Sequence, residues 1–247
     1  MTFEPLLRLE AVSKSFGSVN ALERVDFAAY AGEIHAIVGD NGAGKSTVVK
    51  IVTGIHGMDA GQLYINGKTV DVQLTASLSS KLGVAVVYQD LALVECLDIA
   101  TNMALGTAPR KFGFVLDRRA MVSQAATVLR DLNVRVGDVK TPVGLLSGGQ
   151  RQIVAVARAM RLDKPIILLD EPTAALGVRE SLQVRDMMMR LKTSGKAVVI
   201  VSHDLELVMQ LSDRITVLRL GNSVATRKIK ETSKDELVAL ITGLARG

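Results

Sequence analysis

The sequence predicts an α/β fold with a mostly parallel sheet, an antiparallel β region near the N-terminus and an inserted helical region. Residues 6–30 alternate between apolar and polar side chains, which is typical of half-exposed antiparallel strands. Residues 90–140 instead show a helical pattern with few strand signals. Four short apolar runs have the character of buried strands, and they occupy residues 34–38, 84–88, 165–169 and 197–201.

The first 72 residues contain signals for two antiparallel pairs of strands. The alternating region places Phe16 and Gly17 at a turn. Phe16 has two interpretations: its ring holds the hairpin by packing, or it offers a face on which an adenine base stacks. Asn66-Gly67 supplies the two positive-φ residues of a type I′ turn, so residues 61–72 predict a second hairpin.

Helices and late strands follow from periodicity and capping residues. Within the inserted region, residues 98–105 and 117–132 carry the clearest helical patterns, and Asp117 is the expected N-cap of the second. The apolar stripe of that helix comprises Ala125, Val128, Leu129 and Leu132. The remaining predicted helices cover residues 75–82, 148–160, 177–192 and 234–241, and the late strands cover residues 214–219 and 224–229.

The composition is that of a globular protein. Of the 247 residues, 48% are hydrophobic and 22% are charged, and no apolar run approaches the ~18 residues of a membrane span. Residues 1–9 lack the basic start and the apolar core of a secretion signal. Cys96, the single cysteine, matches no nucleophile signature. We therefore expect a cytosolic protein in which Cys96 is an ordinary packed residue.

The formal net charge of +5 raises the question of nucleic-acid binding. The basic residues are scattered, with local concentrations only at Arg110-Lys111, Arg118-Arg119 and residues 227–230, none of which has interleaved aromatic side chains. Such groups favour a solvated surface over a nucleic-acid site.

The pattern G-x-x-x-x-G-K-[ST] predicts a phosphate-binding loop between the strand at residues 34–38 and a following helix. Its glycines allow tight turns that point backbone N–H groups inward, and the helix N-terminus adds a positive dipole end. The lysine supplies a cation for the β- and γ-phosphates, and the serine supplies a hydroxyl for Mg²⁺. The loop is Gly39-Asp40-Asn41-Gly42-Ala43-Gly44-Lys45-Ser46, and we include Thr47 among the nucleotide-binding residues.

Two carboxylates and a histidine follow buried strands, at the edge where α/β sheets place ligands. Asp170 and Glu171 end one strand, and adjacent side chains of an extended segment point in different directions. We expect Asp170 to face Mg²⁺ and Glu171 to face the attacking water as a general base. His203 follows the next strand. The other two histidines, His35 and His56, are interpreted as structural or surface residues, because no second carboxylate or cysteine lies at metal-ligand spacing.

Ser147-Gly148-Gly149-Gln150 opens the helix at residues 148–160. Ser147 and Gln150 have the spacing of a capping box, which by itself explains a helix start. Two glycines are not needed for capping, and they leave N–H groups that a second phosphate can approach.

Taken in order, these motifs resemble those of the ATP-binding cassette ATPases, and the resemblance covers nearly the whole chain. It rests on the phosphate loop, Gln89, residues 146–150, the Asp170-Glu171 pair and His203. Residues 170–176, Gly106, the helix that begins with Asp117-Arg118-Arg119 and the ending 236–243 look like the ATPases of bacterial monosaccharide importers, of the ribose, xylose and fructose kind.

The resemblance implies an activity and a set of roles. ATP and Mg²⁺ are the expected cofactors. Phe16 would stack on adenine, Gln89 would sense Mg²⁺ and the water, and His203 would contact the γ-phosphate. The catalytic residues would therefore be Glu171, His203 and Gln89, and the metal would be held by Ser46, Gln89 and Asp170.

The resemblance also implies partners and a location. A second cassette, either a copy of this chain or a different one, would present Ser147, Gly148, Gly149 and Gln150 to the nucleotide. A membrane permease would bind the ATPase at the cytoplasmic face of the bacterial inner membrane, and a periplasmic sugar-binding protein would act indirectly. Nucleic acid is not an expected partner.

A single cassette domain would span residues 1–247. Residues 1–89 and 163–247 would form a P-loop NTPase core of the RecA-like kind with its antiparallel β subdomain, and residues 90–162 would form the helical subdomain with the signature motif. One position departs from the family pattern: Gly177 follows residues 174–176, where the family usually has Asp. The alternatives are a cassette of another transporter, such as one for amino acids, and a soluble cassette ATPase.

Overall fold

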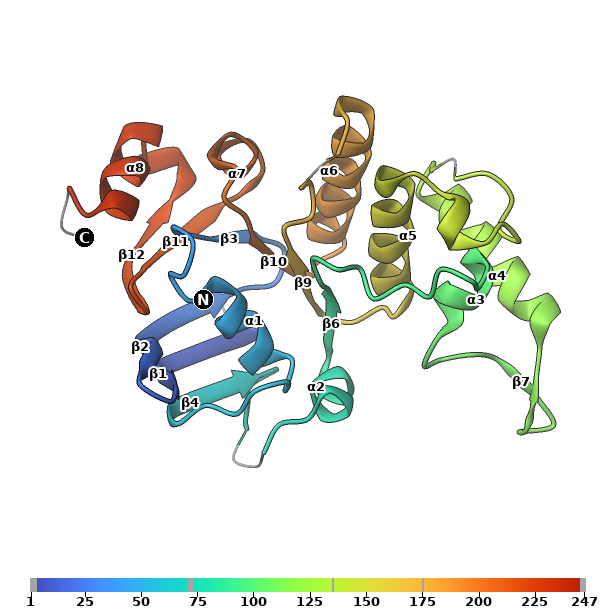
Figure 1. Cartoon of the computed structure of the whole chain (residues 1–247), viewed down its shortest axis with the longest axis horizontal. Helices are drawn as coiled ribbons and strands as arrows, with labels where there is room; N and C mark the ends of the chain where they lie inside the picture. The colour runs from blue at the N-terminus through green and yellow to red at the C-terminus, as the bar shows by residue number, and fades with distance from the viewer. Residues whose placement is uncertain (1–3, 71–72, 135, 175, 245–247) are drawn as a thin grey trace. The chain divides into compact units, whose positions relative to one another are not determined.

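A computed structural model describes residues 4–70, 73–134, 136–174 and 176–244, and it separates into two compact units (Figure 1). The larger unit comprises Met1–Val86, Lys164–Glu171 and Met188–Gly247. The smaller unit comprises Val87–Asp163 and Pro172–Met187. The predicted subdomain limits, residues 90–162 for the helical part, remain a prediction.

The sheet of the larger unit has the strand order β5-β4-β1-β2-β12-β11-β3-β10-β9-β6. Neighbours β11, β3, β10 and β9 are parallel, and every residue of β3, β9 and β10 is buried. The predicted strands are thus confirmed: β1 Leu7–Phe16, β2 Val19–Ala29, β3 Ile34–Val38, β4 Ala60–Ile65, β5 Lys68–Thr69, β6 Val84–Val87, β9 Ile166–Asp170, β10 Ala197–Val201, β11 Arg214–Arg219 and β12 Asn222–Lys228.

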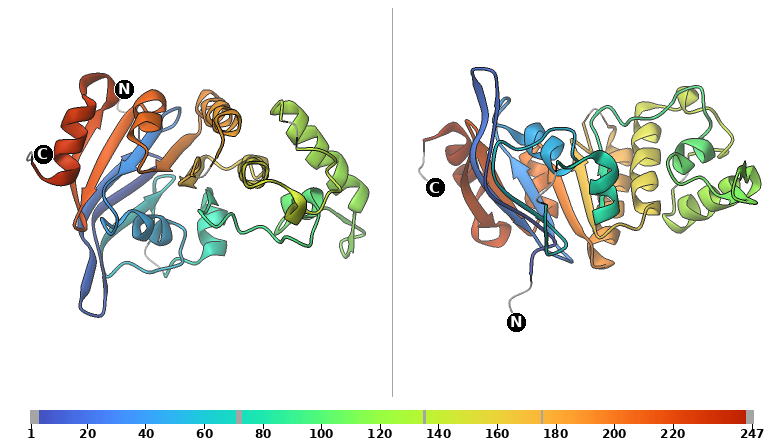
Figure 2. Two further views of the ribbon diagram at one scale, coloured as in Figure 1. Left: turned by 45° about the horizontal axis from the view of Figure 1, so that its top comes forward. Right: turned by 90° about the horizontal axis from the view of Figure 1, so that it is seen from below.

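The antiparallel region forms one side of this sheet. β1 pairs with both β2 and β4, and the β1–β2 hairpin, dark blue in Figure 2, extends well beyond the neighbouring strands. Asn66 and Gly67 both have positive φ between β4 and β5, as the hairpin prediction requires. A parallel bridge between Asn222 and Arg24 joins β12 to β2, so antiparallel and parallel strands form one continuous sheet.

Helices of the larger unit are α1 Lys45–Val52, α2 Ala76–Leu82, α7 Leu205–Leu211 and α8 Lys234–Thr242, with the 3₁₀ turn η2 Ile229–Glu231. Thr75 and Ser233 cap α2 and α8 through their hydroxyl groups. His35 is buried in β3, where Nδ1 donates to the carbonyl of Ala28 and Nε2 lies 2.8 Å from the Thr216 hydroxyl. The interpretation of His35 as a structural residue is confirmed.

The smaller unit is mainly helical, with α3 Ile99–Ala104, α4 Arg118–Asp131, η1 Val143–Leu145 and α5 Gly148–Arg161, and α6 Val178–Thr193 begins in it. α3 packs against α4 and α5. Asp117 caps α4 as predicted. The buried residues of α4 are Met121, Ala125 and Leu129, so Met121 belongs to the buried face in addition to two members of the predicted stripe.

One expectation for the smaller unit was wrong. Cys96 is exposed rather than packed. The region also contains a short hairpin of β7 Arg110–Lys111 and β8 Val115–Leu116, which its helical pattern did not indicate. Two-residue strands are too short to show an alternating pattern, so periodicity cannot reveal them. None of the helices in the described part of the chain is long and apolar enough to cross a bilayer.

Candidate nucleotide-binding site

The phosphate loop connects β3 to α1, as the motif requires. Gly44 precedes α1 with φ of 105°, a left-handed conformation that glycine adopts without strain, and no side chain caps the helix. A Cβ at Gly44 would lie 2.7 Å from the carbonyl oxygen of Ala21, so the loop packs directly against β2. The first N–H groups of α1 therefore remain available to an anion.

Lys45 folds back over the loop that precedes it. Its Nζ donates to the carbonyl oxygens of Gly39 at 2.8 Å and of Asp40 at 2.9 Å, and the side chain is buried. Burial lowers the pKa of Lys45, while the nearby carboxylates of Glu171, Asp40 and Asp170 oppose that shift. The ammonium is thus held by neutral acceptors, which the oxygens of a phosphate group can replace.

The strand order brings the catalytic candidates of the larger unit to one edge. β10 lies between β3 and β9 in parallel register, so the loop after β3, His203 after β10 and Asp170-Glu171 at the end of β9 share the carboxyl edge of the sheet. The Nδ1 of His203 lies 2.8 Å from Oε1 of Glu171. Glu171 is a non-glycine residue at φ of 51°, a sparsely populated conformation that is common at functional sites.

Asp170 differs from Glu171 in its surroundings. Its side chain is buried, and burial, followed by the charge of Glu171, raises the pKa of Asp170, while Lys45 and Lys50 act in the opposite direction. A bound cation would favour the ionised carboxylate at this position.

Mg²⁺ requires hard oxygen ligands, and it typically uses one or two protein groups together with substrate phosphates. Ser46 at the start of α1 and Asp170 at the end of β9 supply a hydroxyl and a carboxylate in the larger unit. The described residues contain no group of three or more His, Cys, Asp or Glu side chains that could hold a metal alone. These donors therefore fit a metal that is bound jointly with a nucleotide.

Phe16 ends β1 with its ring partly exposed. The His56 ring meets it edge to face with the centroids 5.0 Å apart, and Lys14 Nζ lies 5.5 Å from its centroid. This environment leaves ring surface open for stacking, so the adenine interpretation of Phe16 stays a prediction.

In the smaller unit, Ser147 is the N-cap of α5 and forms a complete capping box with Gln150. Gly148 is open, since no atom lies within 4 Å of a Cβ built on it. Gly149 is not: such a Cβ would lie 2.4 Å from Cγ of Glu180. The space beside Gly148 is therefore open, whereas Glu180 lies beside Gly149, and the expectation that N–H groups of this helix start meet a phosphate stays a prediction.

Gln89 is exposed and follows β6. The next segment contains Leu91 and Ala92, both at positive φ, and their carbonyl oxygens accept hydrogen bonds of 2.8 and 2.7 Å from the guanidinium of Arg158 in α5. Sequence reasoning missed Arg158, because an arginine within a helix carries no local signal of a contact 66 residues away. The same helix that opens on the signature residues thus fixes the segment after Gln89.

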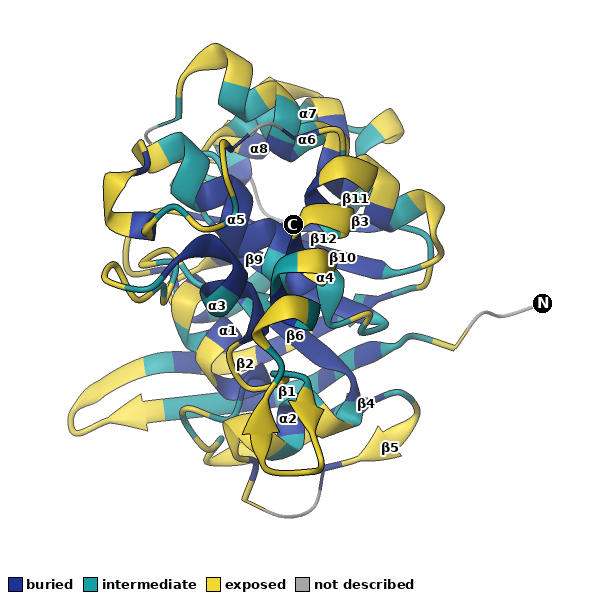
Figure 3. Ribbon diagram, turned by 90° about the vertical axis from the view of Figure 1, so that its right-hand side faces the viewer, coloured by how far each residue is buried: buried dark blue, intermediate teal, exposed yellow. Residues whose placement is uncertain are grey.

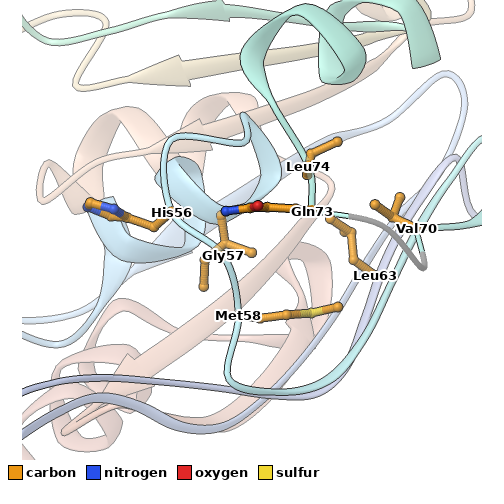
Figure 4. A pocket seen from close by; sticks show the side chains of 8 residues that line it. His56, Gly57, Met58, Leu63, Val70, Gln73 and Leu74 are labelled. Atoms are coloured by element: carbon orange, nitrogen blue, oxygen red, sulfur yellow. The ribbon is translucent and has the colours of Figure 1, made fainter.

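The structure therefore gathers the phosphate loop, Asp170, Glu171 and His203 within the larger unit, whereas Gln89 and residues 147–150 belong to the smaller one. A cavity of about 340 Å³ in the larger unit includes no phosphate-loop residue (Figure 4). Its lining is mostly apolar, with His56 and Gln73 as polar members. The cavity thus contains none of the residues named for the nucleotide site, although His56 in its lining contacts Phe16.

Fold and site together define an ATP-binding cassette. The family model for the ABC transporter matches residues 22–174. The fructose import ATP-binding protein of Rhizobium meliloti is 40% identical, and the match covers 98% of this chain and 96% of that protein. A xylose/arabinose import ATP-binding protein of Sulfolobus acidocaldarius is also 40% identical with the same coverage. The chain belongs to the ABC transporter family.

Other relatives differ in length or are known as structures. A ribose import ATP-binding protein of Chromobacterium violaceum is 40% identical over 95% of this chain, which spans about half (46%) of that relative. A dimeric ATP-binding cassette, solved in a post-hydrolysis state with ADP and Pi, has a TM-score of 0.79 at 27% identity, with 92% of this chain and all of that chain covered.

Proposed function

We propose that this protein is the ATP-hydrolysing subunit of an importer that takes up a monosaccharide. The observation that carries the proposal is the full-length match to two sugar import ATP-binding proteins, each covered to 96%. The site is consistent with it, because a phosphate loop and two strand-end carboxylates supply the groups that phosphoryl transfer to water requires.

In this proposal each residue has a distinct role. The loop from Gly39 to Thr47, which includes Lys45, binds the phosphates. Phe16 stacks on the adenine. Glu171 accepts a proton from the attacking water. At the same time the water oxygen bonds to the γ-phosphorus, and the bond between the γ-phosphorus and the bridging oxygen of the β-phosphate breaks. His203, held on Glu171, orients that carboxylate and contacts the γ-phosphate. Ser46, Asp170 and Gln89 would hold Mg²⁺, which neutralises phosphate charge when bound.

The proposed assembly contains a second cassette and a membrane permease. Gly148 and Gly149 begin a 14-residue helix that Ser147 caps, and these three residues would complete the nucleotide site of the second cassette. The dimeric state of the related cassette supports this pairing. The permease would hold the pair at the cytoplasmic face of the membrane, and a periplasmic sugar-binding protein would deliver the solute.

The test is purification of the tagged chain from native membranes, combined with sugar uptake in cells that lack the gene. We expect a multi-span permease and a cassette partner in the purified complex. We also expect loss of uptake of one monosaccharide, restored by the wild-type gene and by Glu206→Gln but not by Glu171→Gln. Glu206 is an exposed residue of α7 and provides the matched change of charge. The sugar assignment would be overturned if cells that lack the gene took up all sugars normally but lost the uptake of another solute.

A further inference from the structure

The hairpin of β7 and β8 ends in an exposed apolar tip. Arg110 pairs with Leu116 and Lys111 with Val115, and residues 112–114 form the turn. Phe112 is 87% exposed and Phe114 is 77% exposed, and Val115 and Leu116 are also exposed. Figure 3 colours exposed residues yellow, and in Figure 1 the strand labelled β7 lies in a hairpin away from the helices of its unit.

This exposure is costly and specific. Burial of a phenylalanine side chain stabilises a fold by roughly 1.5–3 kcal/mol. Because Phe112 and Phe114 are both exposed, the fold lacks this stabilisation at two positions. The whole chain contains five phenylalanines and no tryptophan, so two of its few large aromatic side chains lie at this one tip. Phe112 also has positive φ of 54°, an uncommon conformation for a bulky residue. The side chains of Phe112 and Phe114 therefore do not contribute to the hydrophobic core of the chain.

The base of the hairpin is firmly attached. The N–H of Asp117 donates to the carbonyl of Pro109 at 2.9 Å, and its carboxylate caps α4 and lies 3.5 Å from Lys111 Nζ. Arg118, the next residue, binds the buried Asp98 at 2.5 Å, and Asp98 is the N-cap of α3. Two helices therefore hold the tip away from the body of the smaller unit.

The charges around the tip are mostly positive. Residues 110–119 contain four basic side chains and one acidic side chain, Asp117, which is already engaged with Lys111 and with α4. Arg110 and Arg119 are exposed, and within the described part of the chain neither has an ion-pair partner. Apolar side chains flanked by such cations match an anionic lipid surface, where rings enter the acyl boundary and cations meet headgroup phosphates.

A protein partner fits these observations less well. Two phenylalanine side chains bury about 150–250 Å² each, whereas a specific protein interface needs about 800 Å² per partner. Reversible membrane contact requires only a few apolar side chains combined with basic ones. We propose that the tip, residues 110–116, inserts Phe112 and Phe114 into the headgroup region of an anionic membrane and gives this protein a lipid contact of its own.

The absence of tryptophan from the sequence allows a direct test. Phe114→Trp introduces a single fluorophore at the tip, and Leu244→Trp places one at a residue that is 86% exposed at the end of the larger unit. Each purified variant is titrated with phosphatidylcholine vesicles with and without phosphatidylglycerol. We expect a blue shift only for Phe114→Trp, only with the anionic vesicles, and reversed by salt. Unshifted emission of Phe114→Trp with anionic vesicles would overturn the proposal.

Flotation measures the contribution of the side chains. We expect Phe112→Ser/Phe114→Ser and Arg110→Gln/Arg119→Gln each to lower partitioning onto anionic vesicles about tenfold or more. Leu244→Ser should bind like wild type, and all variants should retain their melting temperature because the changed side chains are exposed. Unchanged flotation of the phenylalanine variant would overturn the proposal. A second result would also overturn the proposal: wild type does not bind vesicles, and the phenylalanine variant no longer binds the permease. That result would identify a protein partner of the tip. Neither assay depends on ATP hydrolysis.

Discussion

The imidazole of His203 and the carboxylate of Glu171 are in direct contact, with Nδ1 and Oε1 2.8 Å apart although the two residues are 32 positions apart in the chain. His203 is 69% exposed along its side chain, whereas Glu171 is largely covered. The histidine thus contacts the carboxylate from the solvent side. The contact lies at the carboxyl edge of the sheet, where the phosphate loop also begins after β3.

Removal of this contact should affect turnover more than binding. We expect His203→Ala to lower kcat for ATP hydrolysis about 10²-fold, because a small displacement of the base misaligns the attacking water. The dissociation constant for ATP should change much less. Steady-state phosphate release together with nucleotide titration separates the two quantities. Equal turnover of variant and wild type would show that His203 does not orient Glu171.

Glu171→Gln should retain ATP binding and lose hydrolysis. The amide keeps the shape of the side chain but cannot accept the proton of water, and general bases contribute about 10²–10⁴-fold to rate. Single-turnover phosphate release measures the effect. The matched variant Glu206→Gln removes the same charge at an exposed position of α7 and should hydrolyse ATP normally. A Glu171→Gln variant with wild-type release would exclude this residue as the base.

Phe16→Ala should weaken nucleotide binding. Stacking of a base on an aromatic ring contributes about 1–3 kcal/mol, so the dissociation constant for ATP should rise about 5- to 150-fold. Turnover at saturating ATP should stay close to that of wild type, because the ring is not part of the phosphate chemistry. Calorimetric titration of ATP and of inorganic triphosphate provides the comparison, since triphosphate has no base. If both ligands bind the variant as they bind wild type, Phe16 only packs in the hairpin.

Two neighbouring glycines of α5 should respond differently to alanine. Gly148 has open space where a Cβ would lie, so Gly148→Ala should stabilise the fold by about 0.4–1 kcal/mol. At Gly149 the Cβ would lie 2.4 Å from Glu180 Cγ, and Gly149→Ala must displace that side chain and should lower stability. Urea unfolding measures both changes. A combined Gly149→Ala/Glu180→Ala variant should recover the loss, and failure to recover would mean that Glu180 is not the obstacle.

Buried His35 should make stability depend on pH. Burial lowers the pKa of His35 to about 3 in the folded state, against 6.5 for an unperturbed histidine. The unfolded chain therefore binds an additional proton between these values. The stabilisation is complete above pH 6.5 and decreases as the pH falls towards about 3, with a slope of up to about 1.4 kcal/mol per pH unit.

Urea unfolding at a series of pH values tests this dependence. His35→Gln retains hydrogen-bonding atoms for Ala28 and Thr216 but does not titrate, so its curve should be flatter than that of wild type below pH 6.5. Parallel curves for the two proteins would show that His35 does not carry the effect.

Contiguous motifs could be predicted from the sequence because their geometry is local. The loop from Gly39 to Ser46 requires only a preceding apolar strand, glycines that permit its turns and a following helix, and all three are adjacent in the chain. The capping box of Ser147 and Gln150 and the hairpin at Asn66-Gly67 are equally local. Each of these features depends on one short, continuous stretch of the chain.

The contacts that connect distant segments could not be predicted in this way. Glu171 meets His203 because β9 and β10 are parallel neighbours, and Arg158 reaches the carbonyls of Leu91 and Ala92 because the smaller unit packs them together. The sequence alone determined the fold class, the phosphate loop and the order of the motifs. Only the tertiary structure decided which side chains share the sheet edge and that Phe112 and Phe114 face solvent, since strand order and burial depend on packing across the whole chain.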